Sequence, residues 1–382
     1  MGFIIVLVIY LAIYITYPFI VIFHELGHAF AYLTLTRPEK IDIFIGSYGN
    51  KKTKLRFKIG RLHFYIKLSF PFFINGGMCQ SSAQESNYVK KLIILLAGPF
   101  FSLFAACVLG YYVFSSDVYG SVKLYLFVLI IWSFISLITN LTPRTNQKTN
   151  VDNDGKQVAF VFRIRRVYSE YILANERFLK GDYVFASEKL TRLASLFPYE
   201  ENFFRPLANS LLLLKNFAEA EKYLTELNKY GNYRTEDYLM WGCLQSFTDR
   251  HELAIENYKK VLADDPNNLV GLNNFGYELI LKEDYSKAQE ILEKAIKISP
   301  DFAYSYSSLG YLKILTGELK EGKRLVEKSV ELDDKNAFSY KHLGVYYLKI
   351  SDKEKALLNF NKAIELDSII EIQNFIQEAN LL

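Results

Sequence analysis

The chain has 382 residues, of which 51% are hydrophobic, and a formal net charge of only +4. That small charge hides two unlike parts: residues 1–166 carry 18 Lys and Arg against 7 Asp and Glu, whereas residues 167–382 carry 27 against 34. Because the basic part is also the hydrophobic part, its charge fits membrane-flanking positions better than nucleic-acid binding. The length predicts two or three domains. The three cysteines lie far apart, which excludes a disulfide framework and a zinc ribbon and favours a reducing environment.

The N-terminal region contains an uncharged apolar run, Phe3 to Phe23, that is long enough to cross a bilayer. The pattern predicts a first helix from about residue 3 to residue 35, ending before Arg37-Pro38. We do not expect a signal peptide, because no Lys or Arg precedes the run and no small-x-small cleavage site ends it.

Inside this predicted helix stands the sequence His24-Glu25-Leu26-Gly27-His28. Residues i and i+4 share one helix face, so both imidazoles can reach one metal ion, and zinc accepts imidazole nitrogen. Glu25 is then placed to take a proton from a water at the metal. The pattern can arise by chance in a soluble helix, but polar groups inside a membrane span are costly unless they serve a purpose. A metzincin would need further Gly and His on the same helix, and residues 29–34 lack them.

Residues 41–75 change to the period of strands. Three short runs, Ile41–Ile45, Leu55–Ile59 and Leu62–Leu68, are separated by glycine-containing turns and predict a small sheet at the membrane face. We interpret His63, a third histidine, as a strand residue rather than a ligand.

Two further spans are predicted, from about Leu92 to Phe114 and from about Val122 to Leu141. The loop from 37 to 91 is rich in Lys and Arg, whereas the link 115–121 has almost none. Since positive charge stays on the cytoplasmic side, the N-terminus should face outward, the basic loop inward, and everything after residue 143 inward.

The third span ends in Asn140-Leu141-Thr142-Pro143, and a polar stretch leads to Asp152-Asn153-Asp154-Gly155. Pro143 would end or kink the helix near the membrane face. An aspartate placed here could fold back toward the metal and complete a His-His-Asp set.

These features together resemble the site-2 protease family, the M50 metallopeptidases. The matching features are His24-Glu25-Leu26-Gly27-His28, Gly76-Gly77, Ala97-Gly98-Pro99, and Asn140-x-x-Pro143 followed by Asp154-Gly155. The resemblance covers residues 1–166 and implies zinc held by His24, His28 and Asp154, with Glu25 as general base. It also implies that Asn140 lies near the site, where we assign it to substrate binding.

The chain departs from this family pattern in two places. The interval from Asn140 to Asp154 is longer than in the commonest members, which leaves Asp152 as a rival ligand. Ser102 also stands where many members carry asparagine. Neither departure removes a catalytic group.

From about Val167 the sequence repeats with a period of 34 residues. Small residues recur at two fixed points of each unit, for example at Ala254 and Ala288 and at Gly276 and Gly310, and prolines fall on the same grid. This is the tetratricopeptide (TPR) pattern, in which small residues let paired helices pack closely. We predict about six units over 167–370 and a terminal helix. On the first helix of each repeat, the positions expected to be exposed include Asn273, Tyr277, Tyr304, Ser307, Tyr311 and Lys341. A basic clamp for a C-terminal carboxylate would need more Lys and Arg than these positions offer. His251 and His342 are interpreted as structural.

The sequence therefore predicts a mostly α fold, with a polytopic membrane domain (1–166, three core spans and a small β element) followed by an α-solenoid of TPR repeats (167–382). The resemblance implies a zinc-dependent endopeptidase that cleaves membrane-spanning proteins or peptides, in an integral membrane protein of, we expect, a bacterial cell membrane. We expect the TPR array to be cytoplasmic and to bind a protein partner on its concave face, while membrane lipid surrounds the spans. The alternative is a membrane-anchored TPR scaffold whose protease-like domain is inactive.

Overall fold

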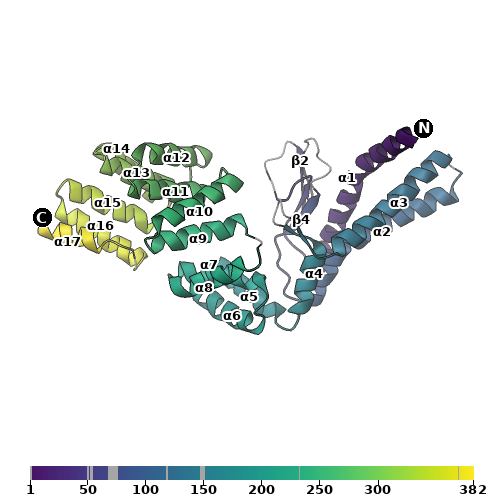
Figure 1. Ribbon diagram of the computed structural model, residues 1–382, viewed down its shortest axis with the longest axis horizontal. Coiled ribbons are helices and arrows are strands. Elements are labelled where there is room, and N and C mark those ends of the chain that lie inside the picture. Colours follow the sequence, from purple (N-terminus) through teal and green to yellow (C-terminus); the bar gives the residue numbers. More distant parts are fainter. Residues whose placement is uncertain are drawn as a thin grey trace. The chain divides into compact units, whose positions relative to one another are not determined.

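The computed structural model describes residues 2–49, 51, 55–67, 76–117, 119–146, 151–231, 233–368 and 370–382, and the backbone alone for residues 2–18. Within these residues the chain forms 17 helices and two small sheets (Figure 1). It divides into two compact units, Met1–Leu196 and Phe197–Leu382. The mostly helical fold class is thus confirmed.

Three long helices frame the first unit: α1 (Gly2–Leu35), α2 (Tyr88–Ser115) and α3 (Gly120–Leu141). Helix α2 packs against both α1 and α3. Asn87 begins α2 by accepting hydrogen bonds from the backbone N–H groups of Val89 and Lys90 at its side-chain oxygen.

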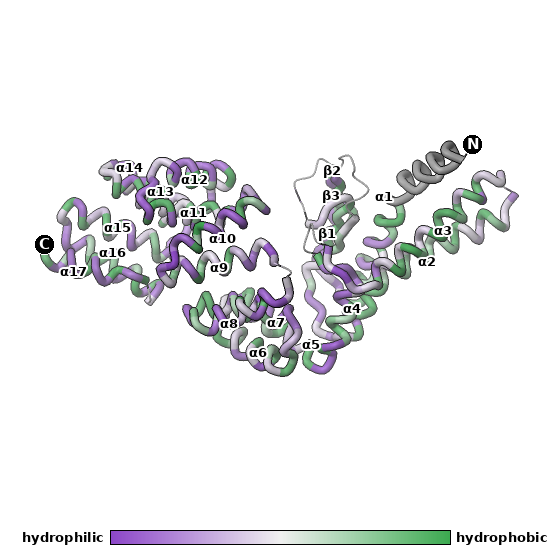
Figure 2. Tube along the Cα trace, in the orientation of Figure 1, coloured by the Kyte–Doolittle hydropathy of each residue, from purple (hydrophilic) through white to green (hydrophobic). Residues whose placement is uncertain are grey.

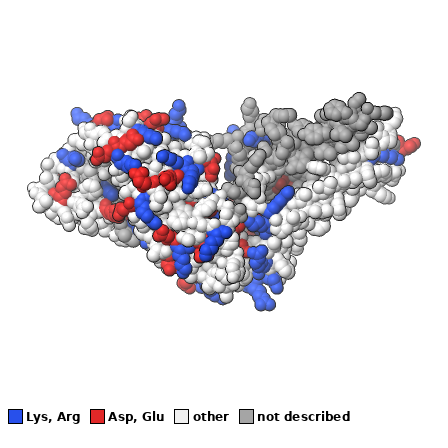
Figure 3. Space-filling model, in the orientation of Figure 1, with Lys and Arg blue, Asp and Glu red and all other residues white. Residues whose placement is uncertain are grey.

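Helices α2 and α3 are each long and apolar enough to cross a membrane. Only 33% and 11% of their most apolar windows are buried, so their apolar side chains face outward, unlike those of a soluble core helix. Figure 2 shows both helices largely hydrophobic, and Figure 3 shows few charged atoms along them. The prediction of three spans is not confirmed, because the part of α1 with described side chains, Phe19–Leu35, is shorter than a span.

The predicted sheet is present and has four strands, β1 (Ile41–Ile45), β2 (Leu55–Ile59), β3 (Leu62–Ile66) and β4 (Gly77–Ser81), in the order β2-β3-β1-β4. Strand β1 runs parallel to β3 and antiparallel to β4. Every residue of β1 is buried, and both β1 and β4 contact α1. The sheet therefore lies on the helix that carries the two histidines. Strand β4 was not predicted, and Leu68, the last residue of the third predicted strand, lies outside the described residues.

A short hairpin, β5 (Thr145–Asn146) and β6 (Val151–Asp152), follows α3 and leads into α4 (Asp154–Arg163). Helix α4 contacts both α2 and α3, so the chain returns to the long helices after Pro143. Helices α5 (Tyr168–Leu179) and α6 (Tyr183–Leu196) complete this unit.

The second unit consists of five helix pairs and a terminal helix. Their bounds are α7 Glu201–Leu213, α8 Phe217–Asn228, α9 Thr235–Phe247, α10 His251–Asp264, α11 Leu269–Leu281, α12 Tyr285–Ile298, α13 Ala303–Leu315, α14 Leu319–Leu332, α15 Ala337–Lys349, α16 Lys353–Leu366 and α17 Gln373–Leu381. The predicted first repeat corresponds to α5 and α6, which belong to the first compact unit. The domain boundary at 166/167 stays a prediction.

The 34-residue spacing of small residues has a direct packing reason in this unit. A Cβ atom at Gly242 would stand 2.5 Å from the Tyr258 ring, and one at Gly276 would stand 2.7 Å from Leu292. Gly344 packs in the same way against the ring of Phe360. In each pair, the glycine of the first helix admits a large buried side chain of the second, which explains the recurrence.

Candidate metal centre

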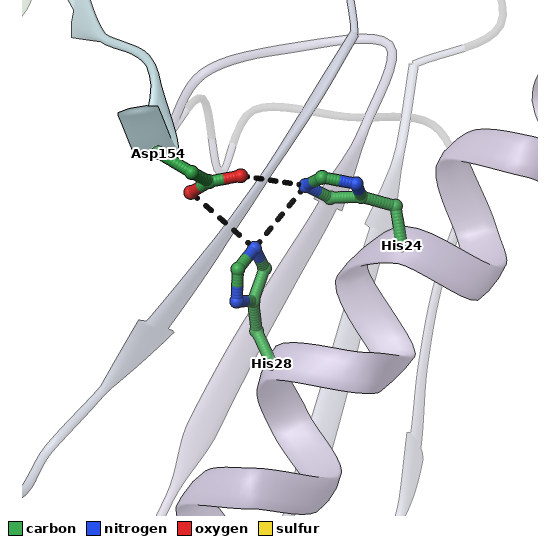
Figure 4. Close-up of side chains that lie close together, drawn as sticks. All are labelled: His24, His28 and Asp154. Carbon is green, nitrogen blue, oxygen red and sulfur yellow. Dashed lines mark hydrogen bonds and ion pairs between the residues drawn. The ribbon is translucent and has the colours of Figure 1, made fainter. Parts of the chain in front are cut away.

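Three side chains from two distant parts of the chain meet beside α1. Figure 4 shows His24 and His28 projecting from successive turns of this helix toward the Asp154 carboxylate at the start of α4. His24 Nε2 lies 3.0 Å from Asp154 Oδ2, and His28 Nε2 lies 3.5 Å from Oδ1. The two Nε2 atoms are 3.2 Å apart. Both histidines are buried.

These separations fit a zinc ion. Ligand atoms at roughly 2.0–2.1 Å from a tetrahedral zinc ion stand about 3.3 Å from one another. The two Nε2 atoms stand 3.2 Å apart, and each lies 3.0 or 3.5 Å from one of the two Asp154 carboxylate oxygens, so all of these contacts are close to that value. Two imidazoles and one carboxylate are also a donor set that zinc accepts, and three protein ligands leave a fourth position for water. His24, His28 and Asp154 therefore fit the metal that the sequence implied.

His28 and Asp154 are held in place by neighbouring groups. His28 Nδ1 lies 2.7 Å from the carbonyl oxygen of Ile94 in α2, which directs Nε2 toward the other ligands. Asn153 caps α4 through its Oδ1, which accepts the N–H of Lys156, and its Nδ2 donates to the carbonyl oxygens of Thr139 and Thr142. It thus ties the end of α3 to the first turn of α4, where Asp154 stands. Sequence reasoning missed this role, although asparagine before a helix start is a preferred cap.

The rival ligand, Asp152, lies on β6 and has other partners. Its Oδ1 accepts a hydrogen bond from Thr145 Oγ1 at 2.7 Å and forms an ion pair with Lys156 at 3.2 Å. Asp154 instead has both carboxylate oxygens directed at the histidines. Burial alone would raise the pKa of the Asp154 carboxyl, but His28 and His24 lower it more, so its pKa falls below the ordinary value.

The glycines of the sequence motifs pack directly around this site. A Cβ atom at Gly98 of α2 would overlap the His28 ring, and one at Gly77 of β4 would stand 2.8 Å from Glu25 Oε1. A Cβ atom at Gly155 would overlap the carbonyl of Leu141. Because these glycines have no side chain, α2 and β4 can pack closely on α1, and α4 can pack closely on the end of α3.

We expect Gly98→Ala to weaken zinc binding about 10–100-fold, as loss of a partner that orients a metal ligand does. The added methyl would displace the His28 ring, while alanine should favour the helix itself. Competition with a chromophoric chelator measures the affinity. Gly120→Ala is the control, because nothing lies within 4 Å of a Cβ there. Wild-type affinity in Gly98→Ala would contradict this account.

The remaining predicted site residues line one cavity of about 480 Å³ together with the three ligands. Glu25 is buried beside the histidines, with its carboxylate against Gly77. Asn140 also lines the cavity, and its Nδ2 donates to the carbonyl oxygen and Oγ of Ser136 at 2.9 and 3.1 Å. His63 is on β3, paired with Asp42 and Lys58 in the sheet, and does not line this cavity.

Solved structures that match part of the chain are TPR proteins. One is the TPR protein TTC0263 of Thermus thermophilus, with 21% identity and a TM-score of 0.42, covering 48% of this chain and 100% of that one. Another is a TPR protein from Parabacteroides merdae, with 17% identity and a TM-score of 0.41, covering 56% and 99%. YrrB, described as a TPR protein with an unusual peptide-binding site, matches with 19% identity and a TM-score of 0.34, covering 52% and 100%. No curated protein matches the chain.

Two family models match the sequence. The tetratricopeptide repeat model matches residues 339–369, which include most of α15 and all of α16. The model of peptidase family M50 matches residues 10–331, which contain all three candidate ligands and extend far into the repeats. Members of that family are zinc metallopeptidases of membranes. By this match over most of its length, the chain belongs to peptidase family M50 and carries TPR repeats in its C-terminal part.

Proposed function

We propose that the chain is an active zinc-dependent intramembrane endopeptidase of the site-2 protease type. The observation that carries the proposal is the arrangement of His24, His28 and Asp154 at separations of 3.0–3.5 Å, with Glu25 in the same cavity. The apolar, outward-facing helices α2 and α3 support a location in the membrane.

In this proposal His24, His28 and Asp154 hold the metal through Nε2, Nε2 and the carboxylate. A bound zinc ion supplies Lewis acidity toward water and toward the scissile carbonyl oxygen. Glu25 takes the proton of the attacking water on its carboxylate and then delivers it to the leaving nitrogen. Asn140 positions the substrate: its Nδ2 donates to Ser136, which leaves its Oδ1 to accept a hydrogen bond from a substrate N–H.

The proposed substrate is a membrane-spanning segment that unwinds locally, because an intact helix occupies its carbonyl groups in hydrogen bonds and hides them from attack. The excess of Lys and Arg in residues 37–91 supports an orientation in which this loop and the TPR array lie in the cytoplasm. The proposed location is a bacterial cell membrane. The array would then recruit a substrate or a partner protein, as TPR repeats generally do.

Removal of the metal tests the proposal. Purified protein in detergent should cleave members of a panel of single-span segments, lose that activity on treatment with phenanthroline, and regain it when Zn²⁺ but not Mg²⁺ is returned. Cleavage that persists in protein shown by elemental assay to lack zinc would contradict the proposed chemistry. A protein that binds zinc but cleaves nothing would instead favour the alternative, a membrane-anchored TPR scaffold with an inactive site.

A further inference from the structure

The second unit encloses a cavity of about 790 Å³ that the proposed proteolysis does not use. Its walls come mainly from the first helices of successive pairs, α9, α11, α13 and α15, and from the link between α16 and α17. The size lies in the range of cavities that bind ligands rather than isolated waters. Most of the positions predicted to be exposed on these helices are in fact buried here: Asn273, Ser307, Tyr311 and Lys341.

Lys341 is the unusual residue of this cavity. Its exposed fraction is 8%, yet it forms no hydrogen bond or ion pair with any residue that the structure describes, and its ammonium group lies 5.9 Å from the centre of the Phe375 ring. The other lysine of the cavity, Lys215, is satisfied, since its Nζ lies 2.9 Å from both carboxylate oxygens of Asp367. The ammonium group of Lys341 thus faces the cavity with little water around it and no counter-ion among the described residues, which is unfavourable for a cation. Burial accordingly lowers the pKa of Lys341, although the charge of Glu371 opposes that shift.

Another wall of the cavity, the link between α16 and α17, shows which kind of chain segment fits this surface. The link between α16 and α17 contains Ile370-Glu371-Ile372, whose two isoleucines are only 7% and 1% exposed. Glu371 lines the cavity and is the acidic group that acts on Lys341, but no ion pair within 4 Å joins these two described residues. An apolar–acidic–apolar segment therefore already packs here without neutralising the lysine.

We propose that this cavity binds an extended peptide of a partner protein, with an internal Glu or Asp side chain paired to Lys341 and apolar neighbours against the surrounding aromatic rings. The proposal deepens the partner-binding role proposed for the array and does not depend on the zinc chemistry.

The charge of the cavity favours a carboxylate over a phosphate. One ammonium group is available, because Lys215 is already paired, and the carboxylates of Asp249 and Glu371 line the same walls. The two carboxylates repel a doubly charged phosphate more strongly than a singly charged carboxylate, whose one charge a direct ion pair with Lys341 can compensate. Tyr304, which is 41% exposed, and Phe338 offer ring surface for the apolar neighbours.

Fluorescence anisotropy on the full-length protein in detergent tests this inference. The probe is a labelled peptide amide, Phe-Ile-Glu-Ile-Phe, compared with the same peptide carrying Gln in place of Glu. We expect the Gln peptide to bind wild type at least about tenfold more weakly, as the loss of a charged hydrogen bond implies. Lys341→Met should weaken the Glu peptide to the same extent and leave the Gln peptide unchanged. Lys349→Met, at the exposed end of the same helix, should change neither.

Two controls keep the result interpretable. Lys341→Met should melt no lower than wild type, because the methionine removes an unpaired buried charge. Glu25→Gln should bind both peptides as wild type does, so a failed protease assay leaves this test intact. Equal binding of the Glu and Gln peptides, or no binding of either, would overturn the inference, as would a lower melting temperature of Lys341→Met. A third peptide, the Gln peptide with a free C-terminal carboxylate in place of the amide, completes the test. If it bound more tightly than the Glu peptide amide, the cavity would recognise the C-terminal ends of chains, and the inference would be overturned.

Discussion

Glu25→Gln should slow cleavage strongly while zinc remains bound. The side chain is buried in the same cavity as the three ligands, but it is not one of them, so the isosteric amide removes the proton acceptor and leaves the metal site. Loss of a general base costs about 10²–10⁴ in rate. Cleavage of a single-span segment in detergent, read by the appearance of new termini, measures the activity, and elemental assay of the same samples measures the zinc.

Glu39→Gln is the matched control, because the same chemical change is made at an exposed residue just after α1. It should retain both zinc and activity. If Glu25→Gln instead cleaved at the wild-type rate with zinc bound, another group would have to accept the proton. If it lost zinc as well, Glu25 would also have a structural role. Its packing against Gly77 of β4 is the contact through which it would act.

The sequence pattern alone predicts that His24 and His28 act together, whereas Asp154 is assigned to the site only through the family resemblance. His24 and His28 share a helix face because of their four-residue spacing, which any helix enforces. Asp154 lies 130 residues from His24, and no periodicity connects them. The choice between Asp152 and Asp154 depends on where α4 begins. Asn153 caps that helix, so Asp154 stands in its first turn while Asp152 belongs to β6 and pairs with Lys156.

The motif glycines and Lys341 show that a sequence pattern can locate a residue without predicting its contacts in the folded protein. Gly98 and Gly77 are visible in the sequence, but their reason, contact with His28 and Glu25, exists only once α2 and β4 pack on α1. The 34-residue period correctly predicts the helix pairs and places Lys341 on a first helix. It cannot predict that Lys341 is buried, because the link that helps to enclose it comes after the last helix pair and breaks the period.

Asp154→Asn should remove zinc, whereas Asp152→Asn should not. The substitution replaces the carboxylate with an amide, which is a weaker metal ligand. It also removes the negative charge that lies 3.0 and 3.5 Å from the two histidines. Since losing even a residue that only orients a ligand costs about 10–100-fold in metal affinity, losing a ligand should cost more than about 100-fold. The substitution at Asp152 is the control, because it removes the ion pair with Lys156, leaves an amide oxygen that can still accept the Thr145 hydroxyl, and does not touch the histidines. Chelator competition on both variants, with helical content followed by circular dichroism, gives the comparison. Greater loss of zinc in Asp152→Asn would make Asp152 the third ligand and would require the start of α4 to rearrange when the metal binds.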